Sequence, residues 1–288
     1  MWYNFVMNFL FPIFAAILQT GSFTIDKVVL SIKRVNFKTY TGISFPLIFL
    51  ITLIIFIIFQ PPLSQELFTG NLLWLLIISI GMTIVTNLIF YRALDSDYLG
   101  EIQTFDLLRN IPIIIISSLL FADERNFTII IPAFIASVAV IWSHWEHHHF
   151  KIAKNTLPFI VWSMFAASVG APISKVLLQN WNPISLELVS SGVIAIILGS
   201  LFIKYTNKIS FKTFLLLLTT NILTSIAWIL FYFSYQRSGI IYTILVFSIQ
   251  PLLVYLASVF ILKEPLRWKK VIAFIVVLIS IGFVQILK

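Results

Sequence analysis

The chain has 288 residues, of which 60% are hydrophobic and only 10% are charged, and it carries a net charge of +8. Soluble domains are about 45–50% apolar and about 25% charged, so this composition argues against a soluble enzyme, and disorder would require low hydrophobicity. Cysteine is absent, which excludes disulfides, thiolate nucleophiles and cysteine-ligated metals.

An all-α polytopic membrane protein remains, because a transmembrane barrel would show short alternating strands in place of long apolar runs. A spanning helix needs about 20 mostly apolar residues, and ten segments of the chain meet this requirement. The first segment lacks a basic start and a clear cleavage site, so we expect a retained helix rather than a signal peptide. The ten predicted transmembrane helices are 5–25, 38–59, 70–92, 98–120, 127–145, 156–178, 183–203, 211–235, 239–262 and 269–287.

Basic residues are distributed unevenly along these segments. The connections after the odd-numbered segments contain 14 Lys and Arg residues, whereas the opposite side contains four. Basic loops stay in the cytoplasm, so this distribution supports an even number of spans with both termini outside. We therefore interpret the positive charge as a topology signal of a multi-pass protein of the inner membrane, not as a nucleic-acid-binding surface.

The two halves of the chain resemble each other. The pair Phe90-Tyr91 recurs 141 residues later as Phe231-Tyr232, and Glu124 recurs 140 residues later as Glu264. The charge pattern agrees, since the first connection carries four basic residues and its counterpart after the sixth segment carries one. We expect two five-helix repeats, 1–150 and 151–288, and five is odd, so the second repeat is inverted in the membrane. Inverted repeats typically build a site at their interface and work by alternating access.

This arrangement, with the short acidic turns Ala122-Asp123-Glu124-Arg125 and Leu262-Lys263-Glu264-Pro265, resembles the EamA-type transporters of the drug/metabolite transporter superfamily. The resemblance covers nearly the whole chain, although its motifs are short. It implies a central cavity lined by the early helices of each half and by helices 3, 4, 8 and 9. It also implies a cargo such as an amino acid, an amine, a nucleotide sugar or a drug. Many bacterial members keep both termini in the cytoplasm, whereas the charges here favour the opposite, so the orientation stays open.

The predicted fourth helix is the richest in polar residues. Gln103, Asp106 and Asn110 share one face, and Arg109 lies beside Asp106. Ionisable groups within a membrane are costly, which makes them candidates for a functional site. A carboxylate and a guanidinium on one face could bind a zwitterion or an anion, and Asp106 could carry a coupling proton. The alternative is an internal ion pair that only neutralises itself.

Polar stripes on other segments could line the same cavity, although polar side chains also commonly join helices. Trp228 and Tyr232 could stack on an organic cation. Pro112 and Pro251 could kink their helices and form gates. The further candidates for contact with substrate are Gln19, Asn87, Asn221, Trp228, Tyr232, Tyr242 and Gln250.

Several other charged residues have simpler interpretations. Glu187 is a lesser candidate for the site, and a structural pair with Lys175 is the better interpretation. Asp26 is expected at the membrane interface, where charges cost little. The stretch His144–His149 has the spacing of a di-iron histidine box, but such sites need several boxes and the chain has four histidines in total. We therefore predict no metal and no other cofactor, and the absence of a phosphate-binding loop argues against ATP-driven transport.

These patterns predict a secondary transporter of a small metabolite, present as a monomer or homodimer. A zwitterionic or cationic substrate fits the paired charges and the aromatic residues. Two alternatives stay open. One is an intramembrane enzyme that acts on a lipid-linked substrate, and the other is a structural membrane subunit that transports nothing.

Overall fold

The computed structural model describes residues 2–33, 35–63, 65–96, 99, 102, 107–143, 156–206, 209–262 and 268–287. Every regular element within these ranges is a helix. Eight helical segments are long and apolar enough to cross a membrane, which confirms an all-helical, multi-pass membrane protein. The spans comprise α1 (Trp2–Leu30), α2 (Phe37–Phe59), α3 (Gly70–Ser96), α7 (Leu157–Leu178), α8 (Pro183–Phe202), α9 (Phe211–Ser238), α10 (Ile240–Phe247) together with α11 (Gln250–Leu262), and α12 (Trp268–Leu287).

Two of the ten predicted segments contain shorter helices than expected. The segment 98–120 contains the 3₁₀ turn η2 (Leu107–Arg109) and α5 (Asn110–Leu120), and 127–145 contains α6 (Phe127–Ser143). Both helices are apolar, but neither reaches the length of a full span. Ten full-length spans were predicted, and eight helical segments in the described part of the chain have that length.

Local sequence explains where the helices begin and end. The Asn36 side chain accepts hydrogen bonds from the backbone N–H groups of Lys38 and Thr39 at the start of α2, at 3.1 and 3.0 Å. Asn182 caps α8 in the same way, and Pro183 follows at the first helical position, where its missing N–H costs nothing. Polar residues in the connections thus act as helix caps.

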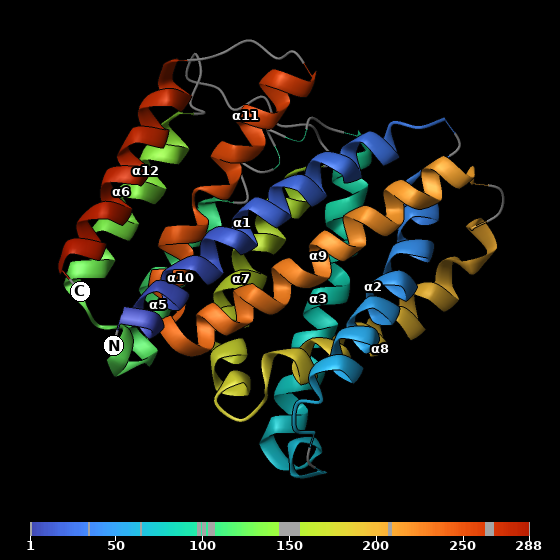
Figure 1. Ribbon diagram of the computed structural model, residues 1–288, viewed down its shortest axis with the longest axis horizontal. Coiled ribbons are helices and arrows are strands. Elements are labelled where there is room, and N and C mark those ends of the chain that lie inside the picture. The colour runs from blue at the N-terminus through green and yellow to red at the C-terminus, as the bar shows by residue number, and fades with distance from the viewer. Residues whose placement is uncertain are drawn as a thin grey trace.

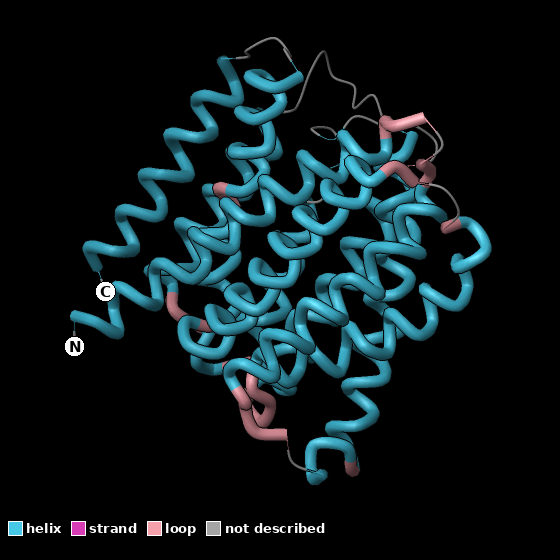
Figure 2. The backbone as a smooth tube through the Cα atoms, turned by 45° about the vertical axis from the view of Figure 1, so that its right-hand side comes forward, coloured by secondary structure: helices cyan, strands magenta, loops and turns pink. Residues whose placement is uncertain are grey.

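Helices from the first half of the chain lie beside helices from the second half. α1 packs along α9, α2 along α8, α3 along α7, and α6 along α12 (Figure 1). The start of α1 and the end of α12 lie near the same edge of the molecule, and helices account for almost all of the described backbone (Figure 2). The core is therefore made by segments far apart in the sequence.

Small residues allow α2 and α8 to approach each other closely. A Cβ atom added to Gly42 would lie 3.0 Å from the backbone oxygen of Phe202, and one added to Gly199 would lie 3.2 Å from the Pro46 ring. Small residues at helix interfaces are typical of membrane proteins, where close packing replaces the hydrophobic effect. The outward faces instead carry large apolar side chains, such as Ile58, Trp74 and Ile196, as a lipid-facing surface requires.

Candidate functional site

Two helix breaks meet at the centre of the molecule. α10 ends at Phe247 and α11 begins at Gln250, directly before Pro251, so the predicted helix 239–262 is interrupted at its proline. α5 begins at Asn110, immediately after η2. The Asn110 side-chain amide donates a hydrogen bond of 3.3 Å to the Ser248 hydroxyl and so joins the two breaks. Broken helices leave backbone groups unpaired, which is tolerated in a membrane where the backbone is covered by protein or lines a cavity.

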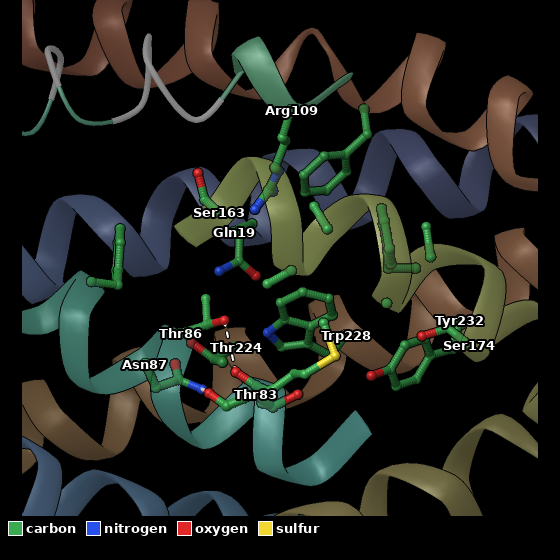
Figure 3. A pocket seen from close by; sticks show the side chains of 18 of the residues that line it. Gln19, Thr83, Thr86, Asn87, Arg109, Ser163, Ser174, Thr224, Trp228 and Tyr232 are labelled. Carbon is green, nitrogen blue, oxygen red and sulfur yellow. Dashed lines mark hydrogen bonds between the residues drawn. The ribbon is translucent and has the colours of Figure 1, made fainter. Parts of the chain in front are cut away.

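A cavity of about 290 Å³ lies beside these breaks. Its walls come from both halves of the chain, including α1, α3 and α5 from the first half and α7, α8, α9 and α11 from the second. Figure 3 shows Arg109 reaching into it towards Gln19, with Thr83, Thr86 and Asn87 on one wall and Trp228 near the centre. This volume is near the lower end of the range for small-molecule sites.

Most of the predicted substrate contacts that the structure describes lie around this cavity. Their role in binding stays a prediction. Gln103 and Asp106, like Glu101, lie outside the described residues. The predicted residues that line the cavity are Gln19, Asn87, Arg109, Asn110, Trp228, Tyr232 and Gln250.

Two predicted residues lie elsewhere. Asn221 is buried and donates a hydrogen bond of 2.7 Å to the Leu217 carbonyl one turn earlier in α9. Tyr242 lies on the wall of a second cavity, of about 210 Å³, and its hydroxyl accepts a hydrogen bond from Gln285. Helical spacing alone cannot distinguish these faces from the cavity face, because α9 and α10 are buried on several sides.

Polar side chains of α3 lie along one wall of the cavity. Thr83 and Thr86 donate hydrogen bonds to carbonyl groups one turn earlier, both at 2.8 Å. The Asn87 amide does the same at 2.9 Å. Trp162 of α7 then donates from its indole nitrogen to the Thr86 hydroxyl, at 2.8 Å. The donors of this wall are thereby satisfied within the protein, and the wall stays polar without carrying a charge.

Aromatic rings from α9 form a second wall. Trp228 lies 5.9 Å from Tyr232 and 5.5 Å from Phe231, between ring centroids. Phe231 also packs at 4.9 Å against Phe247, the last residue of α10. Trp228 is 37% exposed although it lines the cavity, so part of its surface is open to an incoming molecule. Such a wall offers the negative faces of aromatic rings to a cation.

Glu187 of α8 is the carboxylate of this cavity, and its expected pairing with Lys175 is wrong. The Lys175 ammonium instead contacts Asp123 at 2.5 Å and Glu124 at 2.6 Å. Glu187 is buried, lines the cavity and has no hydrogen bond or ion pair with any described residue. Among the described lining residues, the charges are therefore Glu187 and Arg109. The signal in the sequence was the lone carboxylate itself, inside an otherwise apolar segment.

The acidic turn of the first half binds the second half tightly. The Glu124 carboxylate, in the 3₁₀ turn η3 (Ala122–Glu124), accepts hydrogen bonds from the backbone N–H groups of Ile240 and Ile241 at 2.7 and 3.1 Å. These are the first residues of α10, where a negative charge is favoured. Lys175 of α7 completes the cluster. We call the set Asp123, Glu124, Lys175 and the α10 start the interhalf lock.

A second assignment from the sequence also needs correction. Asp26, expected at the membrane interface, is fully buried between α1, α2 and α9. Its position one turn before the end of α1 suggested exposure, but Tyr40 and Thr220 from the neighbouring helices cover it.

Within the described ranges, no group of three or more His, Asp or Glu residues could hold a metal ion. His144–His149 lie outside the described residues.

Comparison with known proteins supports the same family. Residues 155–286 match the model of the EamA-like transporter family, which confirms the predicted resemblance. No curated protein sequence matches the chain. A solved structure described only as "Crystal structure of protein" is similar in fold, with a TM-score of 0.72 and 13% identity, over 97% of this chain and 96% of that one. Members of the EamA family are generally transporters rather than enzymes.

Proposed function

Because residues 155–286 match the EamA-like transporter family, we propose that this multi-pass membrane protein is a secondary transporter of a small metabolite that carries a positively charged amine, either protonated or quaternary. It works in the inner membrane by alternating access between two inverted five-helix repeats, 1–150 and 151–288. The observation that carries this proposal is the Glu187 carboxylate, which pairs with none of the described residues and lies beside the aromatic wall of a cavity shared by both halves.

Support for two inverted repeats comes from which helices are neighbours. In a five-plus-five arrangement, α1 corresponds to α7, α2 to α8, α3 to α9, and α6 to α12. A two-fold rotation that exchanges the halves must turn the α1–α9 pair into the α7–α3 pair. It must leave the α2–α8 and α6–α12 pairs unchanged. These four pairs are among the most extensive helix contacts of the described chain.

The charges of the cavity favour an amine. A buried carboxylate that has no partner among the described residues is costly, and a bound cation offsets part of this cost. Trp228 and Tyr232 lie on the same cavity and can stabilise that cation through their ring faces. Arg109, which also lines the cavity, suits a carboxylate at the other end of the molecule. An amino acid or a similar zwitterion places its amine beside Glu187 and its carboxylate beside Arg109, whereas a simple amine contacts Glu187 alone.

The interhalf lock gives alternating access a closed state. It joins η3 of the first half to α7 and α10 of the second half through two ion pairs and two backbone hydrogen bonds. Rocking of one half against the other must break these contacts on one side of the molecule and so open the cavity there.

Binding of amines to the purified protein tests the proposal. The probes are radiolabelled lysine, putrescine and choline, with glucose 6-phosphate as a probe that lacks an amine. We expect an amine to bind and Glu187→Gln to weaken it by about 30-fold or more, because breaking a desolvated charge pair costs about 2 kcal/mol or more. The matched control is Asp95→Asn, which alters an exposed carboxylate at the end of α3.

Equal affinity of Glu187→Gln and wild-type protein for the bound amine would overturn the assignment of Glu187. Binding of glucose 6-phosphate in preference to every amine would overturn the substrate class.

A further inference from the structure

A second carboxylate, Asp26, lies outside the central cavity and has no role in the proposed substrate site. Its side chain is 0% exposed at the junction of α1, α2 and α9. One oxygen, Oδ1, accepts a hydrogen bond of 2.5 Å from the Tyr40 hydroxyl and one of 2.6 Å from the Thr220 hydroxyl. The other oxygen, Oδ2, is buried and has no hydrogen-bond partner. Oδ2 is thus removed from water and gains no hydrogen bond in exchange.

No cation among the described residues neutralises Asp26. The titratable groups that face it are Tyr40 on α2 and, behind it, Tyr91 on α3, whose rings lie 4.5 Å apart. The facing groups from α9 are uncharged hydroxyls. Lys27, the next residue of α1, turns away and donates to the Leu94 carbonyl at 2.7 Å. Lys38 of α2 lies over the Tyr205 ring at 4.9 Å.

A chain of hydroxyl groups joins Asp26 to the central cavity. Thr220, which contacts the carboxylate, lies 3.0 Å from the Ser22 hydroxyl. Ser22 in turn lies 2.5 Å from the Thr224 hydroxyl. Thr224 is part of the cavity wall. Each hydroxyl can accept a proton on one lone pair and donate its own proton to the next group, so the chain can conduct a proton between cavity water and Asp26.

We propose that Asp26 is a proton-binding site of the transport cycle, reached from the central cavity through Thr224, Ser22 and Thr220. A hydronium ion in the cavity gives one proton to Thr224, each hydroxyl passes its own proton onward, and the Asp26 carboxylate becomes a neutral carboxylic acid. One water molecule is left in the cavity, and no electrons are transferred. The role in transport rests on the proposed function, whereas the binding of a proton does not.

The same series of hydroxyl groups couples proton binding to the movement of the two halves. Ser22 belongs to α1 of the first half, and Thr220 and Thr224 belong to α9 of the second half. A shift of α9 along α1 separates the hydroxyls and disconnects Asp26 from the cavity. The proton is then retained or released only in the conformations in which the two helices are in register, which links its movement to the movement of the halves.

Infrared difference spectroscopy tests proton binding without any substrate. Purified wild-type protein, transferred from alkaline to acidic buffer, is expected to gain a C=O stretching band of a protonated carboxyl group in an apolar environment. Asp26→Asn should lose this band, and the control Asp95→Asn should retain it. If Asp26→Asn does not fold, Tyr40→Phe serves the same purpose, because removal of a hydrogen bond to Oδ1 must shift a band that comes from Asp26. A band that is unchanged in these variants, or absent from the wild type, overturns the proposal.

Transport in proteoliposomes tests coupling, with radiolabelled lysine, putrescine and choline as probes. Asp26→Asn imitates the protonated state, so we expect exchange of the amine to continue while accumulation driven by a pH gradient is lost. Accumulation by Asp26→Asn equal to that of the wild type would overturn the coupling role. If the wild type moves none of these amines, the proposed function fails, and the infrared band still decides whether Asp26 binds a proton.

Discussion

At the scale of single residues, backbone conformation explains why position 239 is a glycine. Gly239 adopts φ +86° and ψ 172°, a region that is essentially restricted to glycine. A Cβ atom added there would lie 2.7 Å from Oε1 of Glu124, within the interhalf lock. The absence of a side chain is therefore what allows the acidic turn to reach the start of α10.

Gly239→Ala is expected to destabilise the protein by about 1–3 kcal/mol, because it combines backbone strain with a clash against a buried carboxylate. Thermal unfolding in detergent measures the effect. Gly282→Ala is the matched control, since a Cβ atom added to this helical glycine meets nothing within 4 Å. A melting temperature of Gly239→Ala equal to that of Gly282→Ala would show that the close contact is not important.

The sequence located polar residues well but could not always tell which neighbour they face. Arg109 and Gln19 were identified because ionisable and amide groups are rare in apolar helices, and both line the cavity. Asp26 was misassigned because its burial comes from Tyr40 and Thr220, of which the second lies 194 residues away. Glu187 was assigned to Lys175 because the two are near in sequence, while the actual partners of Lys175 are about 50 residues distant.

At the scale of helices, the apolar runs and their caps could be predicted, and so could the break at Pro251. The start of α5 at Asn110 places Pro112 in the first turn of that helix, where a proline is tolerated, so the interruption predicted near Pro112 also agrees with the structure. The break between α10 and α11 depends on proline, which has no N–H and clashes with the preceding turn.

Pro251→Ala is expected to restore the backbone hydrogen bond and to join α10 and α11 into one helix. Hydrogen–deuterium exchange of the peptide that contains residues 247–252 measures this change, and we expect its amides to exchange more slowly than in the wild type. The control is Pro46→Ala, in the unbroken helix α2. Exchange at the wild-type rate would show that the break is maintained by packing around Ser248 instead of by the proline.

The interhalf lock also belongs to this scale, because it connects η3, α7 and α10. Lys175→Met leaves Asp123 and Glu124 without their cation, and breaking a buried pair in this way costs about 3–5 kcal/mol. The lock should then open more often. The chain contains no cysteine, so the single variant Ser238→Cys reports on this region through its reaction with a maleimide.

We expect the maleimide reaction of Ser238→Cys to be about tenfold faster or more in the Lys175→Met background, as an opening cost lowered by at least 1.4 kcal/mol implies. Lys269→Met, which alters a lysine that lies over Trp142 and far along the chain from the lock, is the control. An unchanged rate would mean that the ion pairs do not hold the lock closed.

At the scale of the whole molecule, the positions of the helices relative to one another come from contacts between distant segments. The sequence predicted an internal repeat from short motifs, but the pairing of α1 with α9 and of α3 with α7 could not be read from a single sequence, because the apolar faces are chemically similar. The pairing matters for function, since it brings Gln19, Asn87 and Trp228 around one cavity.

Transport of an amine through this cavity is measured by counterflow in proteoliposomes. Vesicles loaded with unlabelled lysine, putrescine or choline are diluted into a trace of the same labelled compound. We expect a transient accumulation of label for at least one amine with wild-type protein, and none with Glu187→Gln. Binding of an amine without any counterflow by the wild type, or undiminished counterflow by Glu187→Gln, would contradict it.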